Sequence, residues 1–212
     1  MRAVVFANGD ITDYNFARRV LKSDDYLICA DGAIRHFIAL DITPDLWIGD
    51  FDSCNFELIC STYSNLKNAK IIKLNPDKDM TDTQAGCDFA IENGANEIVV
   101  LGVVGTRLDQ TLSNIYLLEN LLHRGVKAEI ITENVSVRLY SESFVFKPRR
   151  KYVSLIPIDE SVKINNTTGL KYNLKEFSLL RENSLGVSNE PISETVKIDI
   201  SSGKLLVIES SD

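Results

Sequence analysis

The sequence has few of the features that membrane, secreted and nucleic-acid-binding proteins carry. No apolar run approaches the ~18 residues that a membrane-spanning helix needs, and the longest candidate, residues 98–104, is interrupted by Gly102. Asp10 comes too early for the apolar core of a signal peptide. The chain carries 30 acidic and 23 basic residues, a net charge of −7, so it has no broad positive surface for nucleic acid. We therefore expect a cytoplasmic protein that binds neither membranes nor nucleic acid.

Histidine and cysteine are also scarce. The chain has 2 His and 4 Cys, and no two cysteines have Cys-x-x-Cys spacing. This argues against a zinc site and for reduced, structural thiols. The common nucleotide-binding fingerprints are missing as well: G-x-x-x-x-G-K-[ST] does not occur, and the stretch from Gly102 to Gly105 is only G-x-x-G. Any nucleotide chemistry must therefore depend on other residues.

Roughly the first 135 residues alternate short apolar runs with longer amphipathic segments. Helical patterns run over residues 16–21, 85–90 and 112–118. Between such segments, apolar runs with little alternation are typical of strands buried on both faces; these are residues 3–7, 26–30, 46–49, 70–74, 97–101 and 128–132. Strand, turn and helix repeated in this way predict βαβ units, a parallel sheet and helices on both of its faces. The sequence therefore predicts a three-layer α/β domain.

The pattern changes near residue 135. Val196, Ile198 and Ile200 alternate with polar residues, and no helical period follows. Short strands are predicted at residues 135–140, 143–146, 152–157, 162–165, 176–179, 195–200 and 205–209. Short strands joined by turns favour an antiparallel sandwich or barrel. The boundary lies between residues 133 and 146, and we assign the domains to residues 1–140 and 141–212.

Aspartates follow four of the predicted strands of the first domain. Because the carboxyl ends of parallel strands meet at one edge of a sheet, which is where ligands bind, these side chains are candidate functional residues. They are Asp31, Asp50, Asp52, Asp77, Asp79, Asp82 and Asp109.

Helix capping is the alternative explanation. Asp52 or Ser53, Thr81 or Asp82, and Asp109 could each cap the helix that follows it. Asp-x-Asp doublets, however, exceed what one cap requires, and clustered carboxylates repel one another unless a cation neutralises them.

Hard oxygen ligands of this kind favour Mg²⁺ held together with substrate phosphates. Lys78 and Arg107 lie in the same turns and could hold phosphate oxygens. Carboxylates, Mg²⁺, one Lys and one Arg form a set suited to phosphoryl transfer. Two other classes stay open at this point: a phosphatase that uses Asp50 as nucleophile in Asp50-Phe51-Asp52, and a binding protein without turnover. The doublet follows the third predicted strand, which argues against the phosphatase, and binding alone does not need such a metal set.

The chain resembles the bacterial thiamine pyrophosphokinase family. In the first domain the matching segments are Ala-Asp-Gly-Ala (30–33), Pro-Asp-Leu-Trp-Ile-Gly-Asp-Phe-Asp-Ser (44–53), Asp-Lys-Asp-Met-Thr-Asp (77–82) and Gly-Thr-Arg-Leu-Asp-Gln-Thr-Leu-Ser-Asn (105–114). In the second they are Ser-Leu-Ile-Pro (154–157), Thr-Gly-Leu-Lys-Tyr (168–172) and Gly-Val-Ser-Asn-Glu (186–190). Some relatives place a Trp shortly after the Ser-Asn to stack on thiamine, whereas the only Trp here is Trp47.

The resemblance implies a homodimer with its site between subunits, an α/β domain that binds ATP and Mg²⁺, and a β-sandwich that binds thiamine. It implies transfer of the diphosphate of ATP to the hydroxyl of thiamine, with release of AMP. The residues carried over by motif are Asp50, Asp52 and Asp82 for metal and catalysis, Arg107 and Asp109 for catalysis and ATP, Asp31, Lys78 and Asn114 for ATP, and Ser188 and Asn189 for thiamine. Asp109 is the candidate that orients or deprotonates the hydroxyl.

Overall fold

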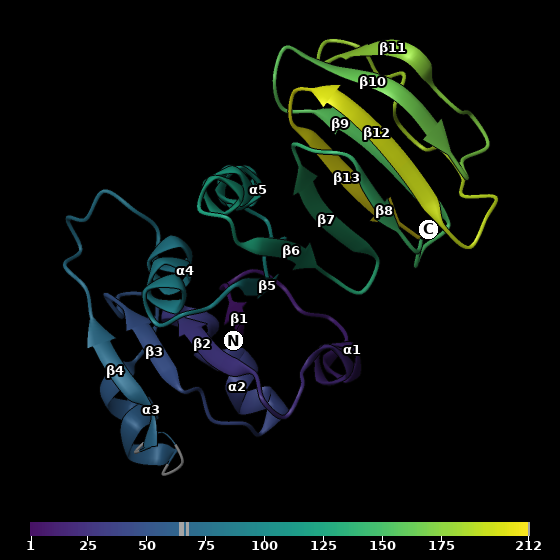
Figure 1. Ribbon diagram of the computed structural model, residues 1–212. Coiled ribbons are helices and arrows are strands. Elements are labelled where there is room, and N and C mark those ends of the chain that lie inside the picture. Colours follow the sequence, from purple (N-terminus) through teal and green to yellow (C-terminus); the bar gives the residue numbers. More distant parts are fainter. Residues whose placement is uncertain (64–65, 67, 212) are drawn as a thin grey trace. The chain divides into compact units, whose positions relative to one another are not determined.

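The computed structural model describes residues 1–63, 66 and 68–211, and its contacts divide the chain into two units, Met1–Glu133 and Asn134–Asp212 (Figure 1). The division falls inside the predicted interval of 133–146. It assigns residues 134–140 to the second unit, whereas the sequence-based assignment ended the first domain at residue 140. The reason is that strand β7 (Val135–Tyr140) pairs along its length with β13 (Leu205–Ser210).

The first unit is built on parallel strands in the order β4-β3-β2-β1-β5-β6. Their bounds are β1 (Arg2–Phe6), β2 (Tyr26–Ala30), β3 (Leu46–Gly49), β4 (Lys70–Lys73), β5 (Glu97–Leu101) and β6 (Lys127–Ile131). Each lies within a residue or two of the predicted apolar run. The order reverses between β1 and β5, and in open α/β sheets ligands bind at the carboxyl ends of the strands beside such a reversal.

Helices cover both faces of this sheet, as predicted. They are α1 (Tyr14–Val20), α2 (Ile34–Leu40), α3 (Phe56–Thr62), α4 (Asp82–Glu92) and α5 (Leu108–His123), with a 3₁₀ turn at Asp31–Ala33. Residues of α1 and α2 pack on the face that bears Phe6 and Trp47. α4 packs on the opposite face, where a Cβ on Gly86 would lie 3.1 Å from Ile28. The absence of a side chain at Gly86 therefore lets α4 approach the strands closely.

The structure shows which residues cap the helices that follow the aspartates. Thr81 caps α4 by accepting from the backbone N–H of Gln84, and Asn55 caps α3 by accepting from that of Leu58. α5 begins after Arg107 without a side-chain cap. Asp52, Ser53, Asp82 and Asp109 therefore do not cap these helices, and their presence at the sheet edge needs another explanation.

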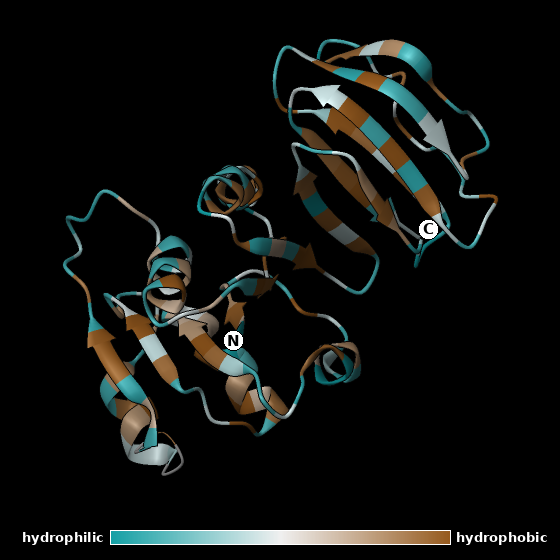
Figure 2. Cartoon of the chain, in the orientation of Figure 1, coloured by the Kyte–Doolittle hydropathy of each residue, from teal (hydrophilic) through white to brown (hydrophobic). Residues whose placement is uncertain are grey.

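The second unit is an antiparallel sandwich. Strands β7, β13 and β9 (Tyr152–Pro157) pair in that order, and a second sheet has the order β11-β10-β12-β8. The second sheet comprises β8 (Phe144–Phe146), β10 (Ser161–Thr168), β11 (Lys175–Leu180) and β12 (Val196–Ser202). Figure 2 shows hydrophobic and hydrophilic residues alternating along β12. The inward residues of both sheets form one core, which includes Val162, Ile198 and Val207.

In the described part of the chain, no helix is both long and apolar enough to cross a bilayer.

Candidate active site

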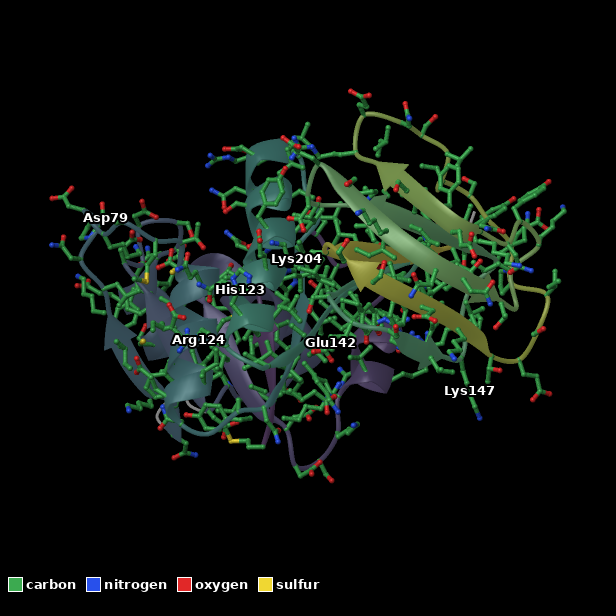
Figure 3. All side chains as sticks on the ribbon, turned by 45° about the horizontal axis from the view of Figure 1, so that its top comes forward. Asp79, His123, Arg124, Glu142, Lys147 and Lys204 are labelled. Carbon is green, nitrogen blue, oxygen red and sulfur yellow. The ribbon has the colours of Figure 1, made fainter. Side chains whose placement is uncertain are left out.

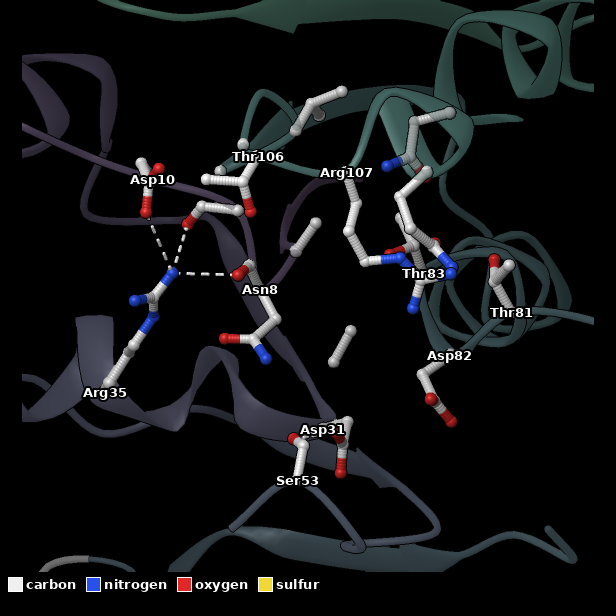
Figure 4. Close-up of a pocket in the computed structure, with 18 of the residues that line it drawn as sticks. Asn8, Asp10, Asp31, Arg35, Ser53, Thr81, Asp82, Thr83, Thr106 and Arg107 are labelled. Atoms are coloured by element: carbon white, nitrogen blue, oxygen red, sulfur yellow. Dashed lines mark hydrogen bonds and ion pairs between the residues drawn. The ribbon is translucent and has the colours of Figure 1, made fainter. Parts of the chain in front are cut away.

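A cavity of about 630 Å³ opens at the carboxyl edge of the parallel sheet (Figure 4). Its walls come from the loops after β1, β2, β3 and β5, from the loop before α4, and from the N-terminal parts of α2, α4 and α5. Of the sequence-predicted residues, those that line it are Asp31, Asp50, Asp52, Asp82, Arg107 and Asn114. The parallel topology therefore brings most of the predicted set to one place.

Asp31 is a buried carboxylate in a strained turn. It has φ of 46°, and its side chain accepts from the backbone N–H of Phe51 at 3.0 Å and from the hydroxyl of Ser53. The indole N–H of Trp47 donates to the Asp31 carbonyl at 2.9 Å. These contacts hold Asp31 in place from the adjacent strand and its loop.

The Asp50-Phe51-Asp52 turn is held by aromatic packing. Phe51 has φ of 63°, a left-handed conformation that costs a non-glycine residue roughly 1–2 kcal/mol. Its ring lies 4.9 Å from that of Trp47 and 4.6 Å from that of Phe56, centroid to centroid. Burial of these rings offsets the backbone strain, so the turn is fixed before any ligand binds.

Lys78 joins two of the carboxylates. Its ammonium group lies 3.0 Å from Asp50 Oδ2 and 3.2 Å from Asp82 Oδ1. Partial burial lowers the pKa of Lys78, but the hydrogen bonds and charges of Asp50 and Asp82 outweigh burial and raise it above its ordinary value. The hydrogen bond from Lys78 lowers the pKa of Asp50. Burial raises the pKa of Asp82, against the opposing effect of Lys78.

Asp31, Asp50 and Asp82 form a group with the chemistry of a metal site. One carboxylate oxygen from each lies within 4.8 Å of the other two. Asp82 Oδ1 is buried and has no hydrogen-bond partner among the described residues, although the Lys78 ammonium lies near it. Mg²⁺ binds oxygen ligands at about 2.0–2.1 Å, so ligand atoms on opposite sides of the ion are about 4 Å apart. The donor type and the spacing therefore fit a divalent cation.

Asp52 lies outside this group. Its side chain is exposed, and the negative charge of Asp50 raises its pKa. The resemblance assigned metal to Asp50, Asp52 and Asp82, whereas the structure places Asp31 with Asp50 and Asp82. Asp52 lines the same cavity, and its role as a ligand stays a prediction.

The loop after β1 forms a wall that the sequence reasoning did not identify. Backbone hydrogen bonds continue the β1–β5 pairing beyond the strands, including Gly9 N to Gly102 O at 2.7 Å. A Cβ on Gly9 would lie 2.6 Å from Val104 O, so glycine is required there. Arg35 donates to Asn8 O and Gly9 O at 2.8 Å each, as the dashed lines in Figure 4 show. This loop reaches the cavity because the strand order reverses at β1. No local sequence motif indicates that reversal, so the sequence alone did not identify the loop.

Arg107 and Asp109 pair with each other. The shortest distance between guanidinium and carboxylate is 2.6 Å, both side chains are exposed, and only Arg107 of the two lines the cavity. The hydrogen bond from Arg107 lowers the pKa of Asp109, which makes this carboxylate a weaker base. Asn114, in contrast, is buried on α5 and lines the cavity.

Ser188 and Asn189 lie in the second unit. The Asn189 side chain accepts from the backbone N–H groups of Tyr172 and Glu190 at 3.0 and 2.9 Å, and donates to the Tyr172 carbonyl at 2.7 Å. Asn189 thus ties two turns together, and within the described residues the second N–H of its amide group takes no part in holding these turns. Ser188 is exposed and has φ of 59°.

Two family models match the chain. Residues 17–130 match the model described as thiamin pyrophosphokinase, catalytic domain, and residues 141–205 match that described as thiamin pyrophosphokinase, vitamin B1 binding domain. The two matches fall in the two structural units.

Curated relatives and solved structures agree with the family models. A thiamine pyrophosphokinase from Bacillus subtilis is 29% identical over 181 residues, which cover 81% of this chain and 80% of that protein. Thiamin pyrophosphokinase 1 of Caenorhabditis elegans is 26% identical and covers 97% of this chain and 88% of its own. The crystal structure of thiamin pyrophosphokinase from Geobacillus thermodenitrificans has 27% identity and a TM-score of 0.88, with 100% of this chain and 98% of that one covered.

Proposed function

The chain belongs to the thiamine pyrophosphokinase family, ATP-dependent transferases that form thiamine diphosphate, and from this premise we propose how its residues act. The observation that carries the proposal is the group of Asp31, Asp50 and Asp82 in the cavity at the sheet edge. A group of clustered, partly buried carboxylates is costly unless a cation binds there, and a polyphosphate substrate is bound with such a cation.

We propose that Asp31, Asp50 and Asp82 hold Mg²⁺, with Asp52 as a further ligand from the rim of the cavity. When bound, the ion supplies positive charge that neutralises and orients the polyphosphate. The strained turns at Asp31 and Phe51 fix the carboxylates in advance, so little reorganisation is needed during the reaction.

Around this group, side chains of the chain position ATP for in-line transfer. Arg107 lines the cavity with a planar guanidinium that suits phosphate oxygens, and the buried amide of Asn114 lines the same cavity. A bond forms between the thiamine hydroxyl oxygen and the β-phosphorus of ATP. The bond from that phosphorus to the bridging oxygen breaks, and AMP leaves with the oxygen. The hydroxyl proton is lost to a base. The lowered pKa of Asp109 makes its carboxylate a weak base, so we assign it the role of orienting Arg107.

We propose that Ser188 and Asn189, in the second unit, bind thiamine. Asn189 shapes that region by holding the Tyr172 and Glu190 turns. The family further suggests a homodimer and a cytoplasmic location. A mass measurement in solution tests the homodimer.

The proposed reaction is tested by incubating the full chain with ATP, Mg²⁺ and thiamine. AMP and thiamine diphosphate should appear in equal amounts. Free phosphate without AMP, or no product at all, would contradict the transferase. Omission of thiamine is the control, because AMP formation should then stop.

The role of Asp52 is tested by Asp52→Asn, with Asp79→Asn as the matched control. Both side chains are exposed, and Asp79, labelled in Figure 3, lies on the loop between β4 and α4. Asp52→Asn should abolish turnover without loss of stability, whereas Asp79→Asn should retain it. Near-normal AMP release by Asp52→Asn would leave Asp31, Asp50 and Asp82 as the metal ligands.

The thiamine assignment is tested by Asn189→Ala. The KM for thiamine should rise more than the KM for ATP. Equal effects would indicate that Asn189 serves only the folding of the second unit.

A further inference from the structure

Lys78 occupies the position of a cation in the carboxylate group. Its side chain is 14% exposed, and its ammonium lies within 3.2 Å of oxygens from both Asp50 and Asp82. Other basic groups near the cavity have different partners in the described part of the chain: Arg35 pairs with Asp10, and Arg107 with Asp109. Lys78 is therefore the cation that balances Asp50 and Asp82 in this structure.

The contacts of Lys78 conflict with those of a divalent ion. The ammonium group takes Asp82 Oδ1, the buried oxygen that otherwise has no hydrogen-bond partner, and Asp50 Oδ2. Asp31 supplies a third carboxylate, and its two oxygens also accept hydrogen bonds from Phe51 and Ser53. A divalent cation that binds here meets a like charge at contact distance, and that charge favours a new anionic partner.

A polyphosphate supplies such a partner. Lys78 lies on the loop that leads into α4, four residues before Asp82, and its flexible stem lets the ammonium turn away without moving the backbone. When metal and nucleotide bind together, the carboxylates of Asp50 and Asp82 pair with the metal and the Lys78 ammonium pairs with the polyphosphate. Metal alone leaves Lys78 facing a second cation.

We propose that Lys78 is an internal counter-ion that the divalent cation displaces from Asp50 and Asp82 and that the nucleotide polyphosphate then binds, so that metal binds tightly only together with nucleotide. This inference rests on the proposed function, because it takes the carboxylate group as the metal site and a polyphosphate as the substrate.

The experiment measures Mn²⁺ binding to the full chain, since Mn²⁺ takes the same oxygen ligands as Mg²⁺ and is detected by electron paramagnetic resonance. Wild type and Lys78→Met are compared without nucleotide, and then with an ATP analogue that has a methylene group between its α- and β-phosphorus atoms. Lys127→Met is the matched control, because it removes one exposed positive charge from the same unit.

Without nucleotide, Lys78→Met should bind Mn²⁺ about tenfold more tightly than wild type, while Lys127→Met should match wild type. The analogue should tighten Mn²⁺ binding to wild type and have a smaller effect on Lys78→Met. Equal or weaker nucleotide-free binding by Lys78→Met, or an equal gain in Lys127→Met, would overturn the proposal.

A measurement on wild type decides the matter if Lys78→Met does not fold. Acetylation of the Lys78 amine, followed by peptide mass spectrometry, should speed up when Mn²⁺ alone is added and slow when the analogue follows, with Lys127 as internal standard. An unchanged Lys78 rate would overturn the proposal. Absence of AMP formation by wild type would instead overturn the proposed function, so the two failures are distinguishable.

Discussion

Asp31→Asn should stabilise the metal-free protein and weaken its binding of divalent cations. The substitution keeps the shape of the side chain. The amide oxygen can accept from the Phe51 N–H, and the amide nitrogen can donate to the Ser53 hydroxyl. What disappears is one of the negative charges that lie within 4.8 Å of one another.

The magnitude follows from that distance. Two charges 4.8 Å apart repel by about 3 kcal/mol at an effective dielectric of ~20 and by about 1 kcal/mol in water. Asp31 has two such neighbours, Asp50 and Asp82. Against this gain, its two hydrogen bonds lose their charge assistance, at about 1 kcal/mol each. The net stabilisation should lie between about 0 and 4 kcal/mol in EDTA, toward the lower end because Lys78 screens the charges of Asp50 and Asp82. Mn²⁺ affinity should fall at least about tenfold with the loss of a charged ligand.

The free energy of unfolding of the first unit can be measured from the fluorescence of a single residue. Trp47 is the only tryptophan, and it is fully buried in the first unit beneath Asp31. Denaturant unfolding followed by Trp47 fluorescence therefore reports on this unit alone. Asp45→Asn is the matched control, because Asp45 accepts from the Leu27 N–H at 2.7 Å but does not belong to the carboxylate group.

The control should show no stabilisation. A loss of more than about 1 kcal/mol in Asp31→Asn would show that its charge serves the turn rather than a cation. Mn²⁺ affinity equal to that of wild type would likewise refute the assignment of Asp31 as a ligand.

Further predictions concern residues that stabilise the structure around the site, and the same unfolding assay tests them. Phe51→Gly should be about 1 kcal/mol more stable than Phe51→Ala, because φ is 63° at this position; the reverse order would show that the turn relaxes. Thr81→Ala should cost about 1 kcal/mol through loss of the α4 cap, and no cost would mean that another group replaces it. Burial lowers the pKa of His36, so its neutral form is favoured in the folded state, and stability should fall as the pH drops below about 6.5. Wild type should show this loss and His36→Gln should lack it; identical pH profiles would contradict the assignment.

Strands β1, β2, β3 and β5 could be predicted because a strand buried on both faces has a continuous apolar sequence. Strand β4 was predicted from the same pattern, but it lies at the end of the strand order and its residues are mostly exposed. The buried face of α5 could not be predicted. The sequence pattern indicated Leu112, Ile115, Tyr116 and Leu118. Leu118 is buried, but the side chains of Leu112 and Tyr116 are 44% and 59% exposed, while Asn114 and Leu121 are buried. Apolar residues occur on more than one side of this helix, and periodicity alone does not tell which side the sheet covers.

The sheet edge at which the site lies could be predicted too, because parallel strands bring their carboxyl ends together. Which carboxylates come together there could not be predicted. In an extended chain, residues two apart face the same way, so Asp-x-Asp suggests that Asp50 and Asp52 act together. Phe51 breaks that rule with its φ of 63°, and Asp52 falls outside the group.

Asp31 enters the group through sheet register rather than through any local motif. Ala30 pairs with Ile48, which places Asp31 beside Gly49 at the ends of β2 and β3. A Cβ on Gly49 would lie 2.8 Å from Asp31 Cβ, so the close approach requires glycine at that position. The glycine before Asp50 thus decides which aspartate joins it, because any side chain there would push Asp31 away from Asp50 and Asp82.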